Sequence, residues 1–185
     1  MNPKSQSENL QSAVGMDYTR LRDLLAAGEW RQADEETARV MLAVSEREKE
    51  GWLKVEHIDN FPCSDLSTID QLWVKYSNGR FGFSVQKRIY QSLGGTRDYD
   101  EKIWSAFGDR VGWRKEKREW LGWRRKREWL YYNDITFDLT APEAHLPLPC
   151  GGRKELVGVG WWGDRIIFSR IETCKLQHIR VTNFF

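Results

Sequence analysis

Residues 17–42 read DYTRLRDLLAAGEWRQADEETARVML, and this stretch decides the fold. Asp17 can cap a helix that ends at Ala27-Gly28, and its apolar face carries Leu21, Leu24 and Leu25. A second helix is predicted from Trp30 to about Glu48. Its buried stripe is Trp30, Ala33, Thr37, Val40, Met41 and Val44, and its solvent face is Glu35, Glu36, Arg39, Glu46 and Arg47. Two helices joined by so short a turn pack antiparallel, which indicates a helical domain.

Further helices are predicted downstream, with extended chain only toward the C-terminus. Ser64 or Ser67 can cap a helix with apolar positions at Leu66, Ile69, Leu72 and Trp73, and Asp70 is placed for a weak capping box with Ser67. Helices around 83–93 and 103–107 follow. Residues 135–139 alternate as an extended segment does, and the tail after Leu156 also suggests short extended pieces. The fold class predicted is mainly α, with minor β near the C-terminus.

The composition describes one domain and excludes several classes of protein. The 185 residues include no apolar run of the roughly 18 residues needed to span a membrane, and the polar start resembles no secretory signal. We expect a flexible leader at 1–16, a core domain at 17–150 and an extension packed on it at 151–185. Cys63, Cys150 and Cys174 are odd in number and far apart, which favours reduced thiols in a cytoplasmic location over a zinc site or a disulfide framework.

The segment WRKEKREWLGWRRKREWLYY at 113–132 repeats one phrase twice. Its eight Lys/Arg and three Glu give a net charge of +5 in a chain of net charge +2, so the basic character is local. Three interpretations remain open on composition. One is a helix whose core stripe is Trp113, Trp120, Trp123 and Leu130, which composition favours. The others are a site for single-stranded nucleic acid and a site for a flat, apolar, anionic small molecule.

No motif in the chain requires catalysis. Residues 158–163, GVGWWG, formally fit a dinucleotide fingerprint, but the following I-I-F looks like a strand, where that fold needs a helix. His57, His145 and His178 are isolated from one another, and His145 in the loop motif A-H-L-P is the candidate for a ligand contact or proton transfer. The acidic cluster at 34–36 is explained by its position in the N-terminal half of a helix.

Several ordered motifs nevertheless resemble one family, the Genomes Uncoupled Four family of tetrapyrrole-binding proteins. They are the stretch 17–42, G-W-L at 51–53, F-P-C-S-D-L-S-T-I-D-Q-L-W at 61–73, S-N-G-R-F-G-F-S-V-Q at 77–86, F-G-D-R-V-G-W-R at 107–114, W-L-Y-Y at 129–132 and A-P-E-A-H-L-P at 141–147. The resemblance implies a compact helical fold likened to a cupped hand, whose palm binds porphyrins such as protoporphyrin IX and its magnesium form. It also implies a non-catalytic activator of magnesium chelatase, partnered with the large porphyrin-binding subunit of that enzyme in chlorophyll biosynthesis. Some members bind bilins.

The resemblance carries over candidate ligand residues. In the palm they are Val74, Phe81 and Phe83, with Trp113, Trp129 and Leu146 as further apolar candidates and His145 as the polar one. Arg110, Arg114 and Arg127 are candidates for the two propionates. Each residue also has an alternative role in the core or at a solvated surface. We expect no protein-bound metal, no nucleic acid partner and a monomer, with peripheral contact to photosynthetic membranes as a further option.

Three departures from the family pattern bear on function. The linker before W-L-Y-Y is doubled, which predicts a longer finger with a Trp/Arg tip over the palm. Ala144 occupies a position that is usually glycine, so the loop is expected to bend differently. The tail from Gly151 differs from that of dedicated chelatase activators. The alternative function is therefore a tetrapyrrole- or bilin-sensing module without chelatase activation.

Overall fold

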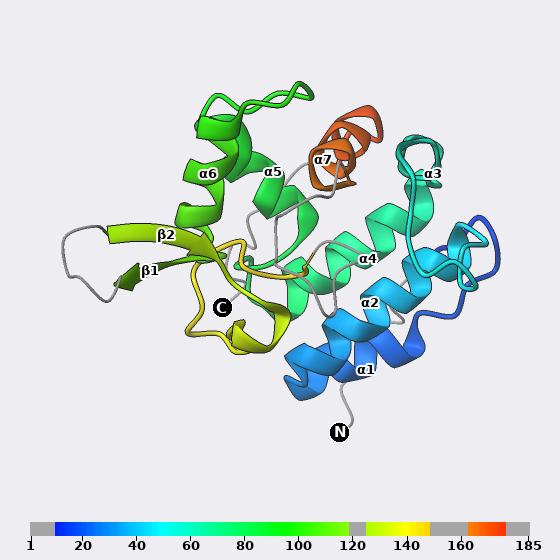
Figure 1. The fold of residues 1–185 in the computed structure, drawn as a ribbon. Coiled ribbons are helices and arrows are strands. Elements are labelled where there is room, and N and C mark those ends of the chain that lie inside the picture. The colour runs from blue at the N-terminus through cyan, green and yellow to red at the C-terminus, as the bar shows by residue number, and fades with distance from the viewer. Residues whose placement is uncertain (1–9, 119–124, 149–162, 177–185) are drawn as a thin grey trace, which may run out of the picture.

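The chain folds as a layered set of helices with one small β-hairpin at its side (Figure 1). A computed structural model describes residues 10–118, 125–148 and 163–176. In these ranges the elements are α1 (Thr19–Ala27), α2 (Trp30–Val44), α3 (Val55–Asp59), α4 (Cys63–Tyr76), α5 (Phe83–Ser92), α6 (Glu101–Arg110), β1 (Arg114–Arg118), β2 (Arg125–Trp129), a 3-10 turn (Tyr132–Asp134) and α7 (Gly163–Thr173). The predicted mainly α fold class is confirmed.

Helices α1 and α2 form the predicted antiparallel pair (Figure 1). Gly28 ends α1 with a left-handed φ of 72°, and the predicted apolar stripe of α2 is buried. Two details of the prediction are wrong. Helix α2 ends at Val44 rather than near Glu48, and Glu36 is buried instead of facing water. Burial of Glu36 is tolerated because Arg39 and Arg20 lie 2.7 and 3.5 Å from its carboxylate oxygens.

Helix α4 starts earlier than predicted, at Cys63 after Pro62, so the proposed serine caps are wrong. Asp70 makes no capping box within α4. Its Oδ1 instead accepts a hydrogen bond of 2.8 Å from the backbone N–H of Ser84, at the start of α5. Nearer the start of α4, the buried carboxylate of Asp65 accepts bonds of 2.8 Å from the Tyr18 hydroxyl and the Ala13 N–H. Part of the expected leader, residues 10–16, therefore packs on α4.

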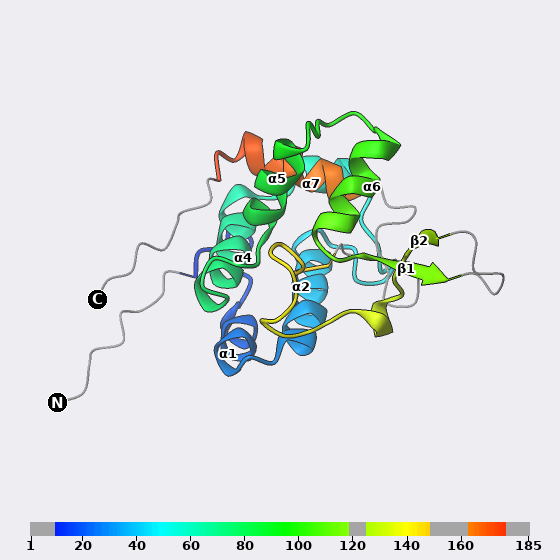
Figure 2. The same ribbon diagram turned by 90° about the vertical axis from the view of Figure 1, so that its left-hand side faces the viewer.

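The tail contains a helix where short extended pieces were predicted. Helix α7 contacts α3 and α5, and it lies beside α5 in Figure 2. Its buried side chains are Ile166, Ile167, Phe168 and Ile171. The sequence I-I-F fits a strand or a buried helix equally well, and the apolar surface of α3 and α5 decides for the helix. Our strand-based reason for rejecting the dinucleotide motif is thus wrong, and residues 158–162 of that motif lie outside the described ranges.

A disulfide joins Cys63, the first residue of α4, to Cys174, which follows α7. The expectation of reduced thiols is wrong for these two cysteines. They are 111 residues apart in the sequence, and only the docking of α7 brings them together. Cys150 lies outside the described ranges.

The doubled Trp/Arg segment forms a β-hairpin, so the helical-stripe interpretation is wrong. Strands β1 and β2 pair antiparallel with Arg114 opposite Trp129 and Arg118 opposite Arg125. The hairpin projects from the helical body in two perpendicular views (Figures 1 and 2). Trp120 and Trp123 fall in 119–124, outside the described ranges, so the predicted tip over the palm stays a prediction.

Candidate ligand-binding site

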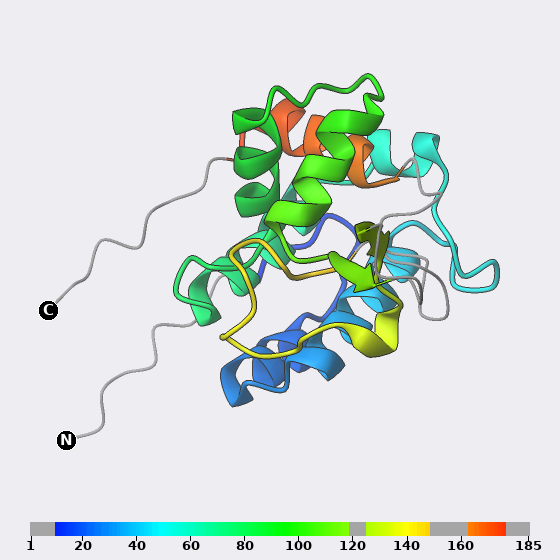
Figure 3. The ribbon, with the colours of Figure 1, turned by 60° about the vertical axis from the view of Figure 1, so that its left-hand side comes forward.

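Three segments that carry predicted site residues meet through hydrogen bonds. They are the start of α5, the end of α6 and the segment 141–148, part of the yellow chain in Figure 3. The N–H of Gly82 donates to the carbonyl of Leu146 at 2.9 Å, and the indole N–H of Trp113 donates to the carbonyl of His145 at 2.8 Å. The amide of Gln86 donates to the carbonyl of Pro147 at 2.7 Å. The structure therefore brings most of the predicted residues into one neighbourhood.

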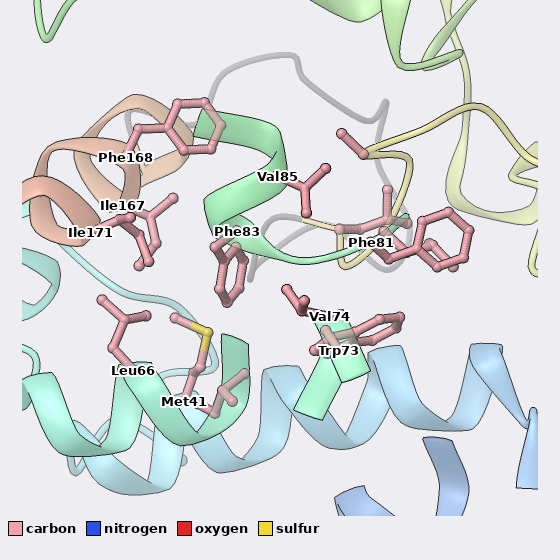
Figure 4. Close-up of a cluster of buried hydrophobic side chains, with 14 of the residues drawn as sticks. Met41, Leu66, Trp73, Val74, Phe81, Phe83, Val85, Ile167, Phe168 and Ile171 are labelled. Atoms are coloured by element: carbon pink, nitrogen blue, oxygen red, sulfur yellow. The ribbon is translucent and has the colours of Figure 1, made fainter. Parts of the chain in front are cut away.

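The apolar palm candidates lie in the core of this neighbourhood. Val74, Phe81, Phe83, Trp113 and Leu146 are each at most 8% exposed. Phe81 packs edge-on against Trp30, with ring centroids 5.6 Å apart, and Phe83 points from α5 into the cluster that includes Met41 and Leu66 (Figure 4). A ligand would reach these five side chains only after neighbouring residues moved. In this conformation they belong to the core that supports the site.

His145 is also buried, at 2% exposure. Its Nδ1 lies 2.6 Å from the carbonyl oxygen of Val111, which fixes the proton on Nδ1. Burial lowers the pKa of the imidazole, against smaller opposing effects of that hydrogen bond and of Asp138. The ring is therefore neutral near pH 7, and Nε2 is a buried acceptor without a hydrogen-bond partner among the described residues.

The base of the hairpin presents a more accessible group of aromatic and cationic side chains, which we call the hairpin base: Trp129, Arg114 and Arg127. Trp129 stacks on Trp104 of α6, with centroids 6.0 Å apart and planes at 29°. The guanidinium of Arg114 lies 5.4 Å from the centroid of the Trp129 ring. Arg127 keeps about half of its side-chain surface in solvent, at 53%.

Asp109 of α6 orders both arginines of the hairpin base. Its Oδ1 lies 3.3 Å from Arg114 Nη1 and 3.2 Å from Arg127 Nη1. Asp109 supplies one negative charge for these two guanidinium groups, and Glu116 stands opposite Arg127 in the hairpin. The exposed half of the Arg127 side chain still leaves this guanidinium accessible to a further anion. Arg110, the next residue of α6, is exposed.

Gly108 of α6 makes the close approach of the hairpin possible. A Cβ at this position would lie 2.4 Å from Cζ3 of Trp129 and 3.0 Å from Cδ of Arg114. Gly108, Asp109 and Trp104 were not predicted as site residues. The motif F-G-D-R at 107–110 contains the relevant signal, because a glycine inside a helix often marks close packing.

Two other kinds of site are absent from the described ranges. No group of His, Cys, Asp and Glu side chains there could hold a metal ion. No helix there is both long and apolar enough to cross a bilayer.

Comparison with known proteins identifies relatives of this chain. A sequence model of a family described as GUN4-like matches residues 11–157. The Ycf53-like protein of Synechocystis sp. is 37% identical over 141 residues, which cover 75% of this chain and 54% of the relative. The chloroplastic tetrapyrrole-binding protein of Arabidopsis thaliana is 35% identical over 97 residues, 51% of this chain and 34% of that protein. The chain thus spans about half the length of the curated relatives it matches, or less.

A solved structure shares the fold. The structure of GUN4 from Chlamydomonas reinhardtii superimposes with a TM-score of 0.65 at 29% identity, covering 88% of this chain and 93% of that one. The resemblance found in the sequence motifs is therefore confirmed at the level of the family and of the fold. Helix α7 begins beyond residue 157, where the family match ends.

Proposed function

Since the chain belongs to the GUN4-like family, we propose that it binds a tetrapyrrole, with a porphyrin as the first candidate. The family match and the similarity to the tetrapyrrole-binding protein of Arabidopsis thaliana support this proposal. The hairpin base is the observation that links tetrapyrrole binding to particular residues. There, Trp129 is stacked on α6, and two arginines share one carboxylate.

The chemistry of a porphyrin suits such a surface. A porphyrin is a broad apolar plate with two propionates at one edge. Covering several hundred Å² of its faces with aromatic side chains would contribute roughly 25 cal/mol per Å² before the costs of association. The propionates require cations at the rim, and Arg127 and Arg110 are exposed to supply them. Arg114 is held against Trp129 and acts mainly by orienting that ring.

The finer proposal is that the chain regulates magnesium chelatase without bond chemistry of its own. It would deliver protoporphyrin IX, or retain magnesium protoporphyrin IX, in contact with the large porphyrin-binding subunit. One observation favours the alternative, a tetrapyrrole- or bilin-sensing module without chelatase activation: helix α7 lies outside the family match and covers α3 and α5. A chelatase assay with and without the protein separates the two, because only the first predicts a higher rate.

Binding is tested by titrating the purified protein with protoporphyrin IX, its magnesium form and a bilin, and following the quenching of tryptophan fluorescence. We expect Arg127→Ala to raise the Kd about tenfold, since one charge-assisted contact is lost. The fold should persist because Asp109 keeps Arg114. Lys126→Ala is the matched control: it removes the same charge from the neighbouring position of β2, which alternation places on the opposite face. Absence of quenching by all three pigments would refute the proposal.

The role of the buried palm candidates in binding has to be tested with conservative substitutions. Phe83→Ala or Trp113→Ala would cost about 3–5 kcal/mol of stability in such a core, and any loss of binding would be uninterpretable. Phe83→Leu and Trp113→Phe keep most of the volume. A selective rise in Kd with little change in stability would assign these rings to the ligand, and an unchanged Kd would assign them to the core.

A further inference from the structure

The Cys63–Cys174 disulfide holds a helix that the family match does not include. Cys63 is the first residue of α4, and Cys174 follows the last residue of α7. Both cysteines are partly exposed rather than buried, so a reductant in solution can approach them. The bond is thus placed where its state affects one element, the eleven-residue helix α7.

Without the disulfide, the contacts of α7 with the rest of the described chain are modest. Among the side chains of α7 whose burial is described, four apolar ones are buried, and their burial opposes the conformational entropy lost in ordering eleven residues. The described polar contacts of α7 range from partly buried to exposed. Arg170 Nε donates to the carbonyl of Phe61 at 2.8 Å, Arg97 Nη1 donates to Ser169 Oγ at 3.0 Å, and Lys87 pairs with Glu172 at 3.8 Å. Each of these contacts, whether exposed or partly buried, contributes only modestly by itself. The covalent link therefore has a large share in keeping α7 docked.

A continuous set of aromatic contacts leads from α7 to the candidate site. Phe168 of α7 lies 5.3 Å from Tyr90 and 5.7 Å from Phe107, as measured between ring centroids. Phe107 lies 5.4 Å from Trp113, whose indole N–H holds the carbonyl of His145. Undocking of α7 would remove one wall of this aromatic cluster.

We propose that Cys63–Cys174 is a thiol–disulfide exchange site, opened by a dithiol reductant, that controls the docking of α7 and through it the packing around Trp113. The effect on ligand affinity rests on the proposed function, whereas the effect on α7 does not. The thiolate of Cys63 sits at the N-terminus of α4, where the helix stabilises negative charge, so Cys63 is the better leaving group.

The exchange proceeds in two steps. A reductant thiolate attacks Sγ of Cys174, the Cys63–Cys174 bond breaks and Cys63 leaves as a thiolate, which takes up a proton. The second thiolate of the reductant then attacks the reductant's first sulfur in the mixed disulfide, and Cys174 leaves as a thiolate, which also takes up a proton. The protein gains two electrons and two protons, and the dithiol becomes a disulfide.

The test compares the full chain before and after reduction with dithiothreitol, without any ligand. We expect amide hydrogen exchange in residues 166–173 to become at least about tenfold faster on reduction, since local opening governs the rate. Cys150→Ser is the matched control and should respond as the wild type does. Cys174→Ser should exchange fast with or without reductant. Equal exchange in α7 of the oxidised and reduced wild type would overturn the proposal, as would three alkylatable thiols in protein kept under oxidising conditions.

Porphyrin titration of both redox states then tests the coupling to the site. We expect the reduced wild type to bind more weakly, by a factor of two or more, and Cys174→Ser to match it. If α7 responds to reduction but neither state binds porphyrin, the proposed function fails while the exchange site stands. If both states bind with equal affinity, the coupling through Phe107 and Trp113 is refuted.

Discussion

Replacement of Asp70 by asparagine tests whether a buried carboxylate weakens this fold at neutral pH. The Asp70 side chain is enclosed between α4 and the start of α5. Burial raises its pKa to about 6, and hydrogen bonds from the backbone N–H groups of Ser84 and Phe83 offset only part of that effect. In Asp70→Asn, the amide oxygen can still accept the hydrogen bond from the Ser84 N–H, so the variant removes the charge and keeps this hydrogen bond.

The magnitude follows from the two pKa values. The folded value of about 6 and the ordinary value of 3.8 differ by roughly 2 units, or about 3 kcal/mol. Well below pH 3.8 the carboxyl is protonated in both states and costs nothing. As the pH rises, the unfolded chain ionises first, so the wild type loses stability until the pH passes about 6. The stability of Asp70→Asn relative to the wild type should therefore increase by about 2–3 kcal/mol between roughly pH 4 and pH 7.

Urea unfolding followed by tryptophan fluorescence at a series of pH values measures this difference, provided that the m-values agree. Asp65→Asn is a matched control in the same helix with the opposite sign. Although burial alone would raise the pKa of Asp65, hydrogen bonds from Ser12, Ala13, Tyr18 and Ser64 together lower it. Asp65 therefore stabilises the wild type above its unfolded pKa, and that contribution is lost as the pH falls through the lowered folded pKa. A pH-independent difference for Asp70→Asn, or one that shrinks as the pH rises, would refute the reasoning.

Two further substitutions test the packing of the hairpin and of the loop that follows it. Gly108→Ala should destabilise the protein by about 1–3 kcal/mol because the new Cβ would overlap Trp129. At most positions inside a helix, the same substitution stabilises a protein. Thermal unfolding measures this change in stability, with Lys102→Ala at an exposed position of α6 as the control. A stabilised Gly108→Ala would contradict the close approach of Trp129 to Gly108. Tyr132→Phe should cost about 1.5–3 kcal/mol in urea unfolding, since buried Asp34 loses a donor at 3.1 Å. Tyr131→Phe, at a side chain 55% exposed, should change little, and equal effects would show that the bond to Asp34 contributes nothing.

The elements predicted best from the sequence are those with a regular apolar period and a clear stop. Helices α1 and α2 have both, with Gly28 between them, and the stripe from Trp30 to Val44 is buried as predicted. The start of α4 was misplaced because serine is a common cap, whereas here Pro62 precedes the helix. The long-range Cys63–Cys174 bond could not be inferred, since it depends on where α7 docks.

The doubled segment shows why composition alone misled. Lys, Arg and Glu favour helix, and the tryptophan spacing fits a helical stripe as well. Pairing of the two copies decides otherwise, since the repeat places Arg114 opposite Trp129 and Glu116 opposite Arg127. Among the site candidates, the sequence motifs located the neighbourhood. They did not distinguish the buried Phe83 and Trp113 from the partly exposed Arg127, because burial depends on packing between distant segments.

The loop around Ala144 indicates which part of the site can adapt to a ligand. Ala144 has a φ of 64°, a left-handed conformation that costs a non-glycine residue roughly 1–2 kcal/mol. The loop keeps this conformation because its surroundings fix it: the Ala144 N–H donates to the carbonyl of Arg80 at 2.7 Å, and the Ala144 carbonyl accepts from Gln86. Next to it, His145 and Leu146 are therefore a rigid frame. The adaptable part is the hairpin base, where the Arg127 side chain is 53% exposed and its ion pair with Asp109 can be exchanged for one with a carboxylate of the ligand.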